Sequence, residues 1–144
     1  MRDAAQRAHF IGPVDDLAAI RALCDQYCRG VIAFDANAIG ATYAEDGRWV
    51  RPDATVIGRA AITEAAASIL ANFDTADFVA HLNDTHVDGD RATGRCYHTE
   101  VFGKDGAISF YLSHYDDVYV KAQGVWRFAE RRFTLLERRR FRPA

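Results

Sequence analysis

Residues 107–136, AISFYLSHYDDVYVKAQGVWRFAERRFTLL, decide the fold class, because they hold two long β-like runs separated by a short turn at 122–124. Two further runs rich in β-branched and aromatic residues precede them, at 78–87 and 91–102. Short turns with Gly and Asp separate the runs. The spacing predicts one antiparallel, strongly bent meander in the second half of the chain.

The first half of the chain has helical patterns instead. After Pro13, apolar residues recur at spacings of three and four, at Leu17, Ile20, Cys24, Tyr27 and Val31. Shorter helices are expected over 36–43 and over the Ala-rich segment 59–73. Helices followed by a meander predict an α+β fold.

Composition limits the classes of function. The chain has 144 residues, 49% of them hydrophobic, which suits one compact domain. Its 18 Lys plus Arg against 20 Asp plus Glu lack the basic excess that nucleic acids select, so no nucleic-acid partner is expected. Without a membrane-length apolar run or a signal-peptide core, we expect no membrane association and a cytoplasmic location. We predict an N-terminal extension over 1–13, a single domain over 14–137 and a basic tail over 138–144.

The sequence lacks motifs for metals and nucleotides. Cys24, Cys28 and Cys96 form no CxxC pair and are expected to be buried thiols, the alternative being a soft metal shared by the first two. The chain contains no GxGxxG, GxxxxGK[ST] or GxSxG sequence. We therefore expect no metal site and no cofactor.

Asp35 is the first candidate for chemistry. It extends the apolar stripe of the first helix by four residues, which would turn a carboxylate toward the core. Asp is also a favoured N-cap immediately before a helical run. Spacing alone leaves both interpretations open.

The third strand run places polar groups within an apolar face. Alternation puts His114 and Asp116 on one face with Ile108, Phe110, Leu112, Val118 and Val120. We predict that this face points inward, with His114 and Asp116 either paired or in contact with a bound molecule. The opposite face carries Tyr111, Tyr115 and Tyr119, and we predict that it mediates self-association, as a homodimer or alternatively a homotrimer.

His81 and His98 lie in the first two strand runs. Together with an inward carboxylate they suit general acid–base chemistry, because the carboxylate fixes the imidazole tautomer and holds its pKa near the working pH. The ordinary alternative for each is a partly buried strand histidine. A two-His, one-carboxylate metal site made from His81, His98, His114 and Asp35 lacks close ligand spacing.

Five segments, in this order, resemble the SnoaL-like branch of the nuclear transport factor 2-like superfamily: AFDANAI, ATYAEDGRW, VIGRAAI, AHLND and HYDDVYVKAQGVWRF. The resemblance covers about 14–136. It implies a cone-shaped α+β barrel, in which a curved antiparallel sheet is wrapped by three helices around a central, mostly apolar pocket.

The segment ends look most like those of the scytalone dehydratases and hexachlorocyclohexane dehydrochlorinases. This resemblance implies that Asp35, His81 and His98 are catalytic, with His81 as base and Asp35 orienting it. The expected substrate-binding residues are Tyr27, Phe34, Trp49, Tyr97, Phe110, Leu112, His114 and Asp116. His114, Asp116 and Phe34 depart from the scytalone dehydratase pattern, which points to a different substrate. Asp116 also lies near the oxyanion-binding Asp of the ketosteroid isomerases.

The resemblance predicts a cofactor-independent, dehydratase-like lyase, or a related isomerase or cyclase. Its substrate would be a hydrophobic cyclic molecule such as a polyketide, steroid or terpenoid, transformed by Asp–His general acid–base chemistry. The alternative is a noncatalytic ligand-binding protein or a subunit of a larger assembly, because one fold hosts both uses. Contact between Asp35 and His81 in an enclosed pocket would favour the enzyme.

Overall fold

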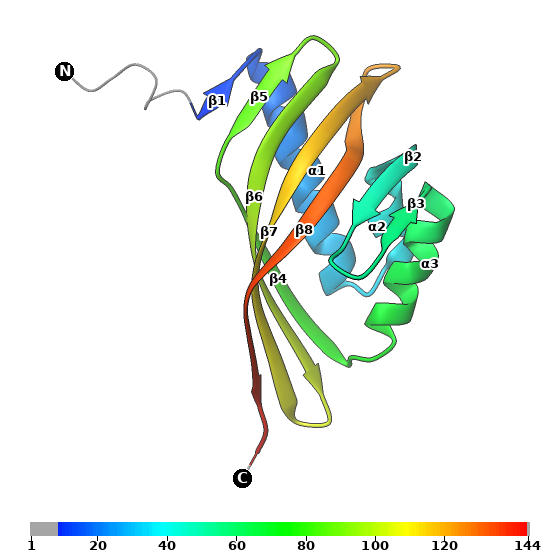
Figure 1. Ribbon diagram of the computed structural model, residues 1–144, viewed down its shortest axis with the longest axis vertical. Coiled ribbons are helices and arrows are strands. Elements are labelled where there is room, and N and C mark those ends of the chain that lie inside the picture. Colours follow the sequence, from blue (N-terminus) through cyan, green and yellow to red (C-terminus); the bar gives the residue numbers. More distant parts are fainter. Residues whose placement is uncertain (1–8, 144) are drawn as a thin grey trace, which may run out of the picture.

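The computed structural model describes residues 9–143. The helices are α1 (Val14–Ile32), α2 (Ala36–Ala41) and α3 (Arg59–Leu70). The strands are β1 (Phe10–Ile11), β2 (Tyr43–Val50), β3 (Thr55–Ile57), β4 (Thr75–Leu82), β5 (Thr85–Asp88), β6 (Arg91–Lys104), β7 (Ala107–Ala122) and β8 (Val125–Phe141). The predicted α+β class, with three helices against one curved sheet, is confirmed (Figure 1).

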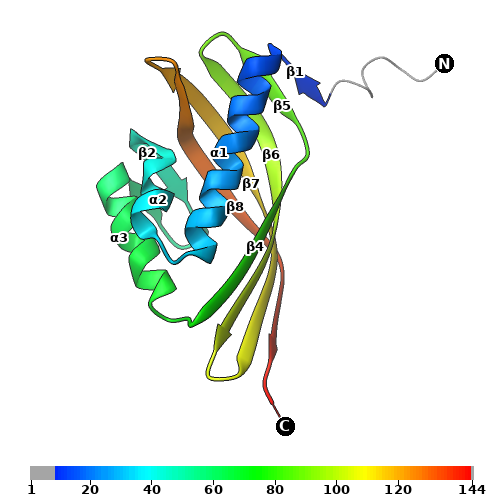
Figure 2. The ribbon, with the colours of Figure 1, turned by 180° about the vertical axis from the view of Figure 1, so that it is seen from behind.

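The sheet follows the order β1-β5-β6-β7-β8-β2-β3, with β4 also paired to β6. The three longest strands, β6, β7 and β8, form an antiparallel meander as the hairpin turns predict. Strands β4 and β5 share one edge of β6, and β2 adds to β8 in parallel. The long strands twist strongly, and the helices lie on one side of them (Figures 1 and 2). The bent sheet and the helices therefore enclose the core between them.

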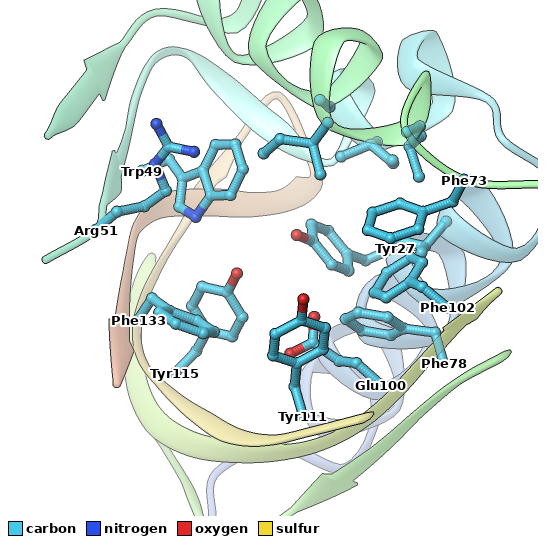
Figure 3. Close-up of a pocket in the computed structure, with 15 residues that line it drawn as sticks. Tyr27, Trp49, Arg51, Phe73, Phe78, Glu100, Phe102, Tyr111, Tyr115 and Phe133 are labelled. Carbon is cyan, nitrogen blue, oxygen red and sulfur yellow. The ribbon is translucent and has the colours of Figure 1, made fainter. Parts of the chain in front are cut away.

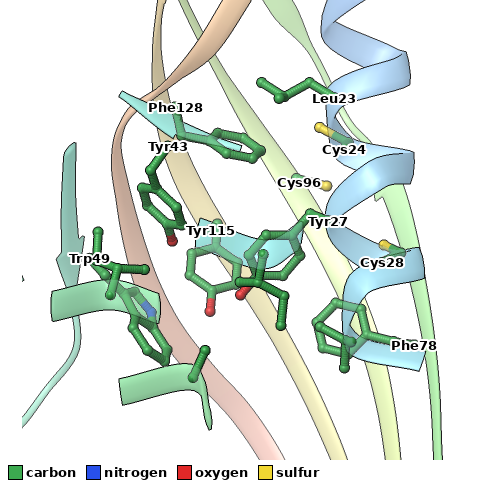
Figure 4. Close-up of a cluster of buried hydrophobic side chains, with 14 of the residues drawn as sticks. Leu23, Cys24, Tyr27, Cys28, Tyr43, Trp49, Phe78, Cys96, Tyr115 and Phe128 are labelled. Atoms are coloured by element: carbon green, nitrogen blue, oxygen red, sulfur yellow. The ribbon is translucent and has the colours of Figure 1, made fainter. Parts of the chain in front are cut away.

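Helix α1 packs its apolar stripe on this sheet. Its first turn carries Asp15 and Asp16 and its last turn Arg29, which complement the helix dipole. Its buried residues include Ile20, Cys24, Tyr27 and Val31 of the predicted stripe. Figure 4 shows this helix facing a cluster of aromatic side chains from the strands of the sheet, β2 included.

The inward face of β7 is the opposite of the predicted one. Tyr115 and Tyr119 are 2% and 0% exposed and belong to the core, whereas Ile108 and Leu112 are each 37% exposed. Alternation divides the strand into the two correct sets, but both sets contain apolar residues, so the pattern does not show which set is inside. The tyrosine stripe is therefore not an exposed interface. The homodimer or homotrimer stays a prediction without support from that stripe.

The ends of the chain are more regular than predicted. Residues 138–141, expected in an exposed tail, continue β8 and pair with 108–111 of β7. In the N-terminal extension, Phe10 and Ile11 pair in parallel with β5. No helix within 9–143 is long and apolar enough to cross a membrane.

Candidate functional site

A cavity of about 270 Å³ lies between the helices and the concave face of the sheet. Its walls are mostly apolar and aromatic, and they come from all three helices and from strands β2, β4, β6, β7 and β8 (Figure 3). The residues that line it are Tyr27, Val31, Ile39, Trp49, Arg51, Ala66, Ile69, Leu70, Phe73, Phe78, Glu100, Phe102, Tyr111, Tyr115 and Phe133. A concave apolar site with a few converging polar groups is the usual form of a small-molecule site.

Glu100 is the acidic residue in the cavity wall. It lies on β6, and its Oε2 accepts a hydrogen bond of 3.0 Å from Ser113 Oγ on β7. Burial raises the pKa of Glu100 to about 7, while the Ser113 hydrogen bond and the Arg131 charge act in the opposite direction. A carboxyl group with a pKa near neutrality can both release and accept a proton under ordinary conditions.

Tyr27 and Tyr115 add hydroxyl groups to the cavity, with Glu100 and Tyr111 close by in the same view (Figure 3). Burial is the main cause that raises the pKa of both Tyr27 and Tyr115. Both phenols therefore keep their protons at neutral pH, and each can donate a hydrogen bond to an oxygen of a bound molecule.

A buried ion pair packs against the rings of Tyr27 and Tyr115. Arg131 donates to Asp117 through Nε at 2.8 Å and Nη2 at 3.0 Å, and both side chains are completely buried. The hydroxyl of Tyr119 also donates to Asp117, at 3.3 Å. The Arg131 guanidinium lies 4.5 Å from the ring centre of Tyr27 and 4.1 Å from that of Tyr115. The ion pair therefore holds the side chains of Tyr27 and Tyr115 in position and places a positive charge against their rings.

His98, one of the predicted catalytic residues, packs in the core beside this pair. It is 2% exposed, its ring lies 4.7 Å from Phe78, and its Nε2 lies 3.5 Å from Arg131 Nη2. Burial and the Arg131 charge lower its pKa well below the usual value, so the imidazole is neutral. Its side chain is outside the set that lines the cavity.

The structure does not bring Asp35 and His81 together. Asp35 is exposed and caps α2, with its Oδ1 accepting a hydrogen bond of 3.0 Å from the backbone N–H of Ala38. His81 is exposed on β4, because the alternate residues Phe78, Ala80 and Leu82 turn toward the core. The structure therefore gives no support to an Asp35–His81 dyad in the cavity, and it confirms the N-cap interpretation of Asp35.

The other predicted pocket residues divide into two groups. Tyr27 and Trp49 line the cavity as expected, while Phe34, with a φ of 56°, packs against the core beside it. The remaining five lie on the face of the sheet that points away from the cavity: Tyr97, Phe110, Leu112, His114 and Asp116. In β6 and β7 they alternate with the inward-facing residues Cys96, His98, Tyr115 and Asp117. They therefore do not line the cavity.

On that outer face, Asp116 is part of an ion pair. Its Oδ1 accepts from Arg95 Nε at 2.8 Å, and its Oδ2 lies 3.8 Å from His114 Nδ1. Its side chain is 46% exposed. Desolvation and the Arg95 charge lower the pKa of His114. His114 is 8% exposed under this face, so the predicted inward pair is instead a half-exposed Asp116 beside a buried His114 on the side of the sheet away from the cavity.

Sequence reasoning missed Glu100, Tyr115, Arg51, Arg131 and Asp117. Glu100 lies two residues after His98 and shares its face of β6, so alternation from His98 would have found it. Arg131 and Asp117 are 14 residues apart on two strands and meet only through the β7–β8 register.

The cysteines are buried and free, as predicted. Cys24 Sγ lies 3.7 Å from the Tyr119 hydroxyl, which places it in the core around the ion pair. Within residues 9–143, no three His, Cys, Asp or Glu side chains are grouped so as to hold a metal ion. The described part of the chain thus gives no support to the metal shared by Cys24 and Cys28.

Solved structures of similar proteins share this architecture. The structure of a variant of Rv3472, a protein of unknown function from Mycobacterium tuberculosis, has 28% identity and a TM-score of 0.79, covering 88% of this chain and 77% of that one. A "Putative Scytalone Dehydratase" from Novosphingobium aromaticivorans has 18% identity, a TM-score of 0.81 and 91% coverage of both chains. The hexachlorocyclohexane dehydrochlorinase LinA type 2 has 16% identity and a TM-score of 0.79, with 89% and 90% coverage.

No curated protein matches the chain by sequence. The SnoaL-like domain model, in contrast, matches residues 13–132, which include all three helices and nearly all of the cavity wall. The predicted resemblance is thereby confirmed. This protein belongs to the SnoaL-like domain family.

Proposed function

We propose that the protein is a cofactor-independent lyase or isomerase that acts on a small cyclic molecule in the cavity, with Glu100 as the proton-transfer group. The observation that carries the proposal is a carboxyl group with a pKa of about 7 in the wall of an apolar cavity. Two structures of the same fold are named for elimination enzymes, a dehydratase and a dehydrochlorinase, which favours the lyase class. Glu100 replaces the Asp–His pair expected from the sequence.

The volume of the cavity limits the size of the substrate. An apolar cavity of about 150 Å³ accommodates benzene. The present cavity measures about 270 Å³, which suits one ring or two fused rings. The proposal therefore favours a one- or two-ring compound over a four-ring steroid.

The chemistry follows from the protonation states of the cavity residues. Ionised Glu100 takes a proton from a substrate carbon next to a carbonyl, and the electron pair of that C–H bond passes into a new C=C bond. The Tyr27 and Tyr115 hydroxyls donate hydrogen bonds to the carbonyl oxygen as negative charge grows there. The electron pair on the oxygen then re-forms the C=O bond. Either the C–O bond of a hydroxyl on the next carbon breaks, a C=C bond forms between the two carbons and Glu100 protonates the hydroxyl, which leaves as water, or Glu100 gives its proton to another carbon of the conjugated enolate. The first outcome is an elimination and the second an isomerisation.

The test measures proton abstraction directly and needs no natural substrate. The two-ring ketone 2-tetralone is dissolved in D₂O with the protein, and NMR follows exchange of its acidic C–H protons above the buffer rate. We expect exchange to accelerate as pH rises through about 7, because only ionised Glu100 accepts a proton. Glu100→Gln should lower the protein-catalysed rate by roughly 10²- to 10⁴-fold. The matched control, Glu64→Gln on the exposed side of α3, should retain it.

Two results would count against catalysis by Glu100. Wild-type exchange rates in Glu100→Gln would exclude Glu100 as the base. Binding of 2-tetralone without any accelerated exchange would favour the noncatalytic ligand-binding alternative.

A further inference from the structure

One wall of the cavity carries two N–H groups without hydrogen-bond partners. Trp49 and Arg51 are two residues apart on the same face of the chain, at the end of β2, and both line the cavity (Figure 3). Trp49 is 8% exposed, and its Nε1 has no hydrogen-bond partner among residues 9–143. The buried Nε of Arg51 likewise has no hydrogen-bond partner among these residues.

The backbone holds both side chains firmly. Trp49 pairs with Val56 of β3 on one side and with Arg131 of β8 on the other. The backbone N–H of Arg51 donates to the carbonyl of Ala54 at 2.9 Å, which closes the turn between β2 and β3. The Arg51 guanidinium also lies over the indole of Trp49, at 4.7 Å from the ring centre. Such stacking leaves the donors at the edge of the guanidinium plane free for a further partner.

Among residues 9–143, the charge of Arg51 is only weakly matched. Asp53 is its salt-bridge partner, with Oδ1 at 3.9 Å from Nε, and the Asp53 side chain is 79% exposed. Such a contact with an exposed carboxylate contributes little. A buried N–H group without a partner is energetically unfavourable, so an acceptor supplied by a ligand would be strongly favoured at this wall.

We propose that Trp49 and Arg51 bind the carboxylate of a cyclic carboxylic acid, which names the substrate class of the site proposed above and rests on that proposed function. The Trp49 indole N–H donates to a carboxylate oxygen, and the Arg51 guanidinium stacked on the same indole supplies the compensating positive charge. The ring then lies among the aromatic walls, with Glu100 on a different part of the wall (Figure 3).

The choice of a carboxylate over other acceptors follows from the number of donors and from their charge. The charged lining residues are Arg51 and Glu100, and Arg131 lies behind the Tyr115 ring. Arg131 is neutralised by its ion pair with Asp117, so Arg51 is the lining cation whose charge a ligand can match. A free indole N–H beside one weakly matched positive charge suits a singly charged carboxylate, whereas a doubly charged phosphate would need more donors than this wall provides.

The experiment compares two probes of the same shape, 2-naphthoate and its neutral amide 2-naphthamide, by isothermal titration calorimetry at pH 7. We expect the wild-type protein to bind 2-naphthoate at least 10-fold more tightly than 2-naphthamide. Arg51→Met should abolish this preference while leaving the amide affinity within about threefold. Trp49→Phe, which keeps an aromatic ring without the N–H, should weaken 2-naphthoate more than 2-naphthamide.

Arg48→Met is the matched control. Arg48 precedes Trp49 on the same strand, its side chain is 48% exposed, and it pairs with Glu130 away from the cavity wall. This variant should keep the full preference for 2-naphthoate. Equal binding of the two probes to the wild type, no binding of either, or an unchanged preference in Arg51→Met would overturn the carboxylate site. The exchange of 2-tetralone, a neutral ketone, distinguishes that outcome from failure of the proposed function.

Discussion

The buried carboxyl of Glu100 makes a prediction about stability that is independent of any substrate. The folded protein raises the pKa of Glu100 from 4.5 to about 7, mainly through burial. Between these values the folded protein holds a proton that the unfolded chain has released. Stability attributable to this group is therefore present at low pH and is lost as pH rises toward 7.

The size of the effect follows from the two pKa values. At about 1.4 kcal/mol for each pH unit, the gap between 4.5 and about 7 corresponds to roughly 3 kcal/mol of unfolding free energy. Glu100→Gln removes the titration but keeps the shape, and its amide oxygen can still accept from Ser113 Oγ. The difference in stability between the variant and the wild type should thus move by roughly 3 kcal/mol in favour of the variant between pH 4 and pH 8.

Urea unfolding of both proteins at several pH values measures this difference, and every group that titrates alike in the two proteins cancels from it. The midpoint of the change should fall between pH 4.5 and about 7. Glu64→Gln should show no comparable trend, since Glu64 is exposed. If the stability difference between Glu100→Gln and the wild type is the same at pH 4 and pH 8, then Glu100 is not a desolvated carboxyl and its proposed role fails as well.

Two further substitutions test the framework around the cavity. Asp117→Asn leaves the charge of Arg131 buried without its counterion. We therefore expect urea unfolding to show a loss of about 3–5 kcal/mol in unfolding free energy, and a near-wild-type value would argue against the buried pair. Asp35→Ala removes the N-cap of α2 and should cost about 0.5–2 kcal/mol, while 2-tetralone exchange stays at the wild-type rate, and a loss of exchange in a folded variant would restore Asp35 as a functional residue.

The sequence alone predicted the elements and their order because these depend on local patterns. The three-and-four spacing from Ile20 to Val31 identified α1, since residues so spaced lie on one face of a helix. Gly and Asp between apolar runs located the turns of the meander, because these residues adopt the backbone angles that tight turns need. The ordered segments then led to the SnoaL-like family, and Tyr27 and Trp49 were correctly expected in the cavity.

Only the tertiary structure decided which groups meet in the cavity. Alternation places Tyr115 and His114 on opposite faces of β7 but does not show which face points inward. That depends on the side chains that pack against the strand. Here the partner is Arg131 of β8. Its charge compensates the buried carboxylate of Asp117, and its guanidinium packs on the ring of Tyr115, so the face that carries both residues is buried. Asp35 and Glu100 show the same limit of sequence patterns. The carboxylate of Asp35 accepts a hydrogen bond from the backbone of the helix that it caps, which is a local contact. Glu100 on the sheet owes its burial and its raised pKa to side chains that are distant in sequence.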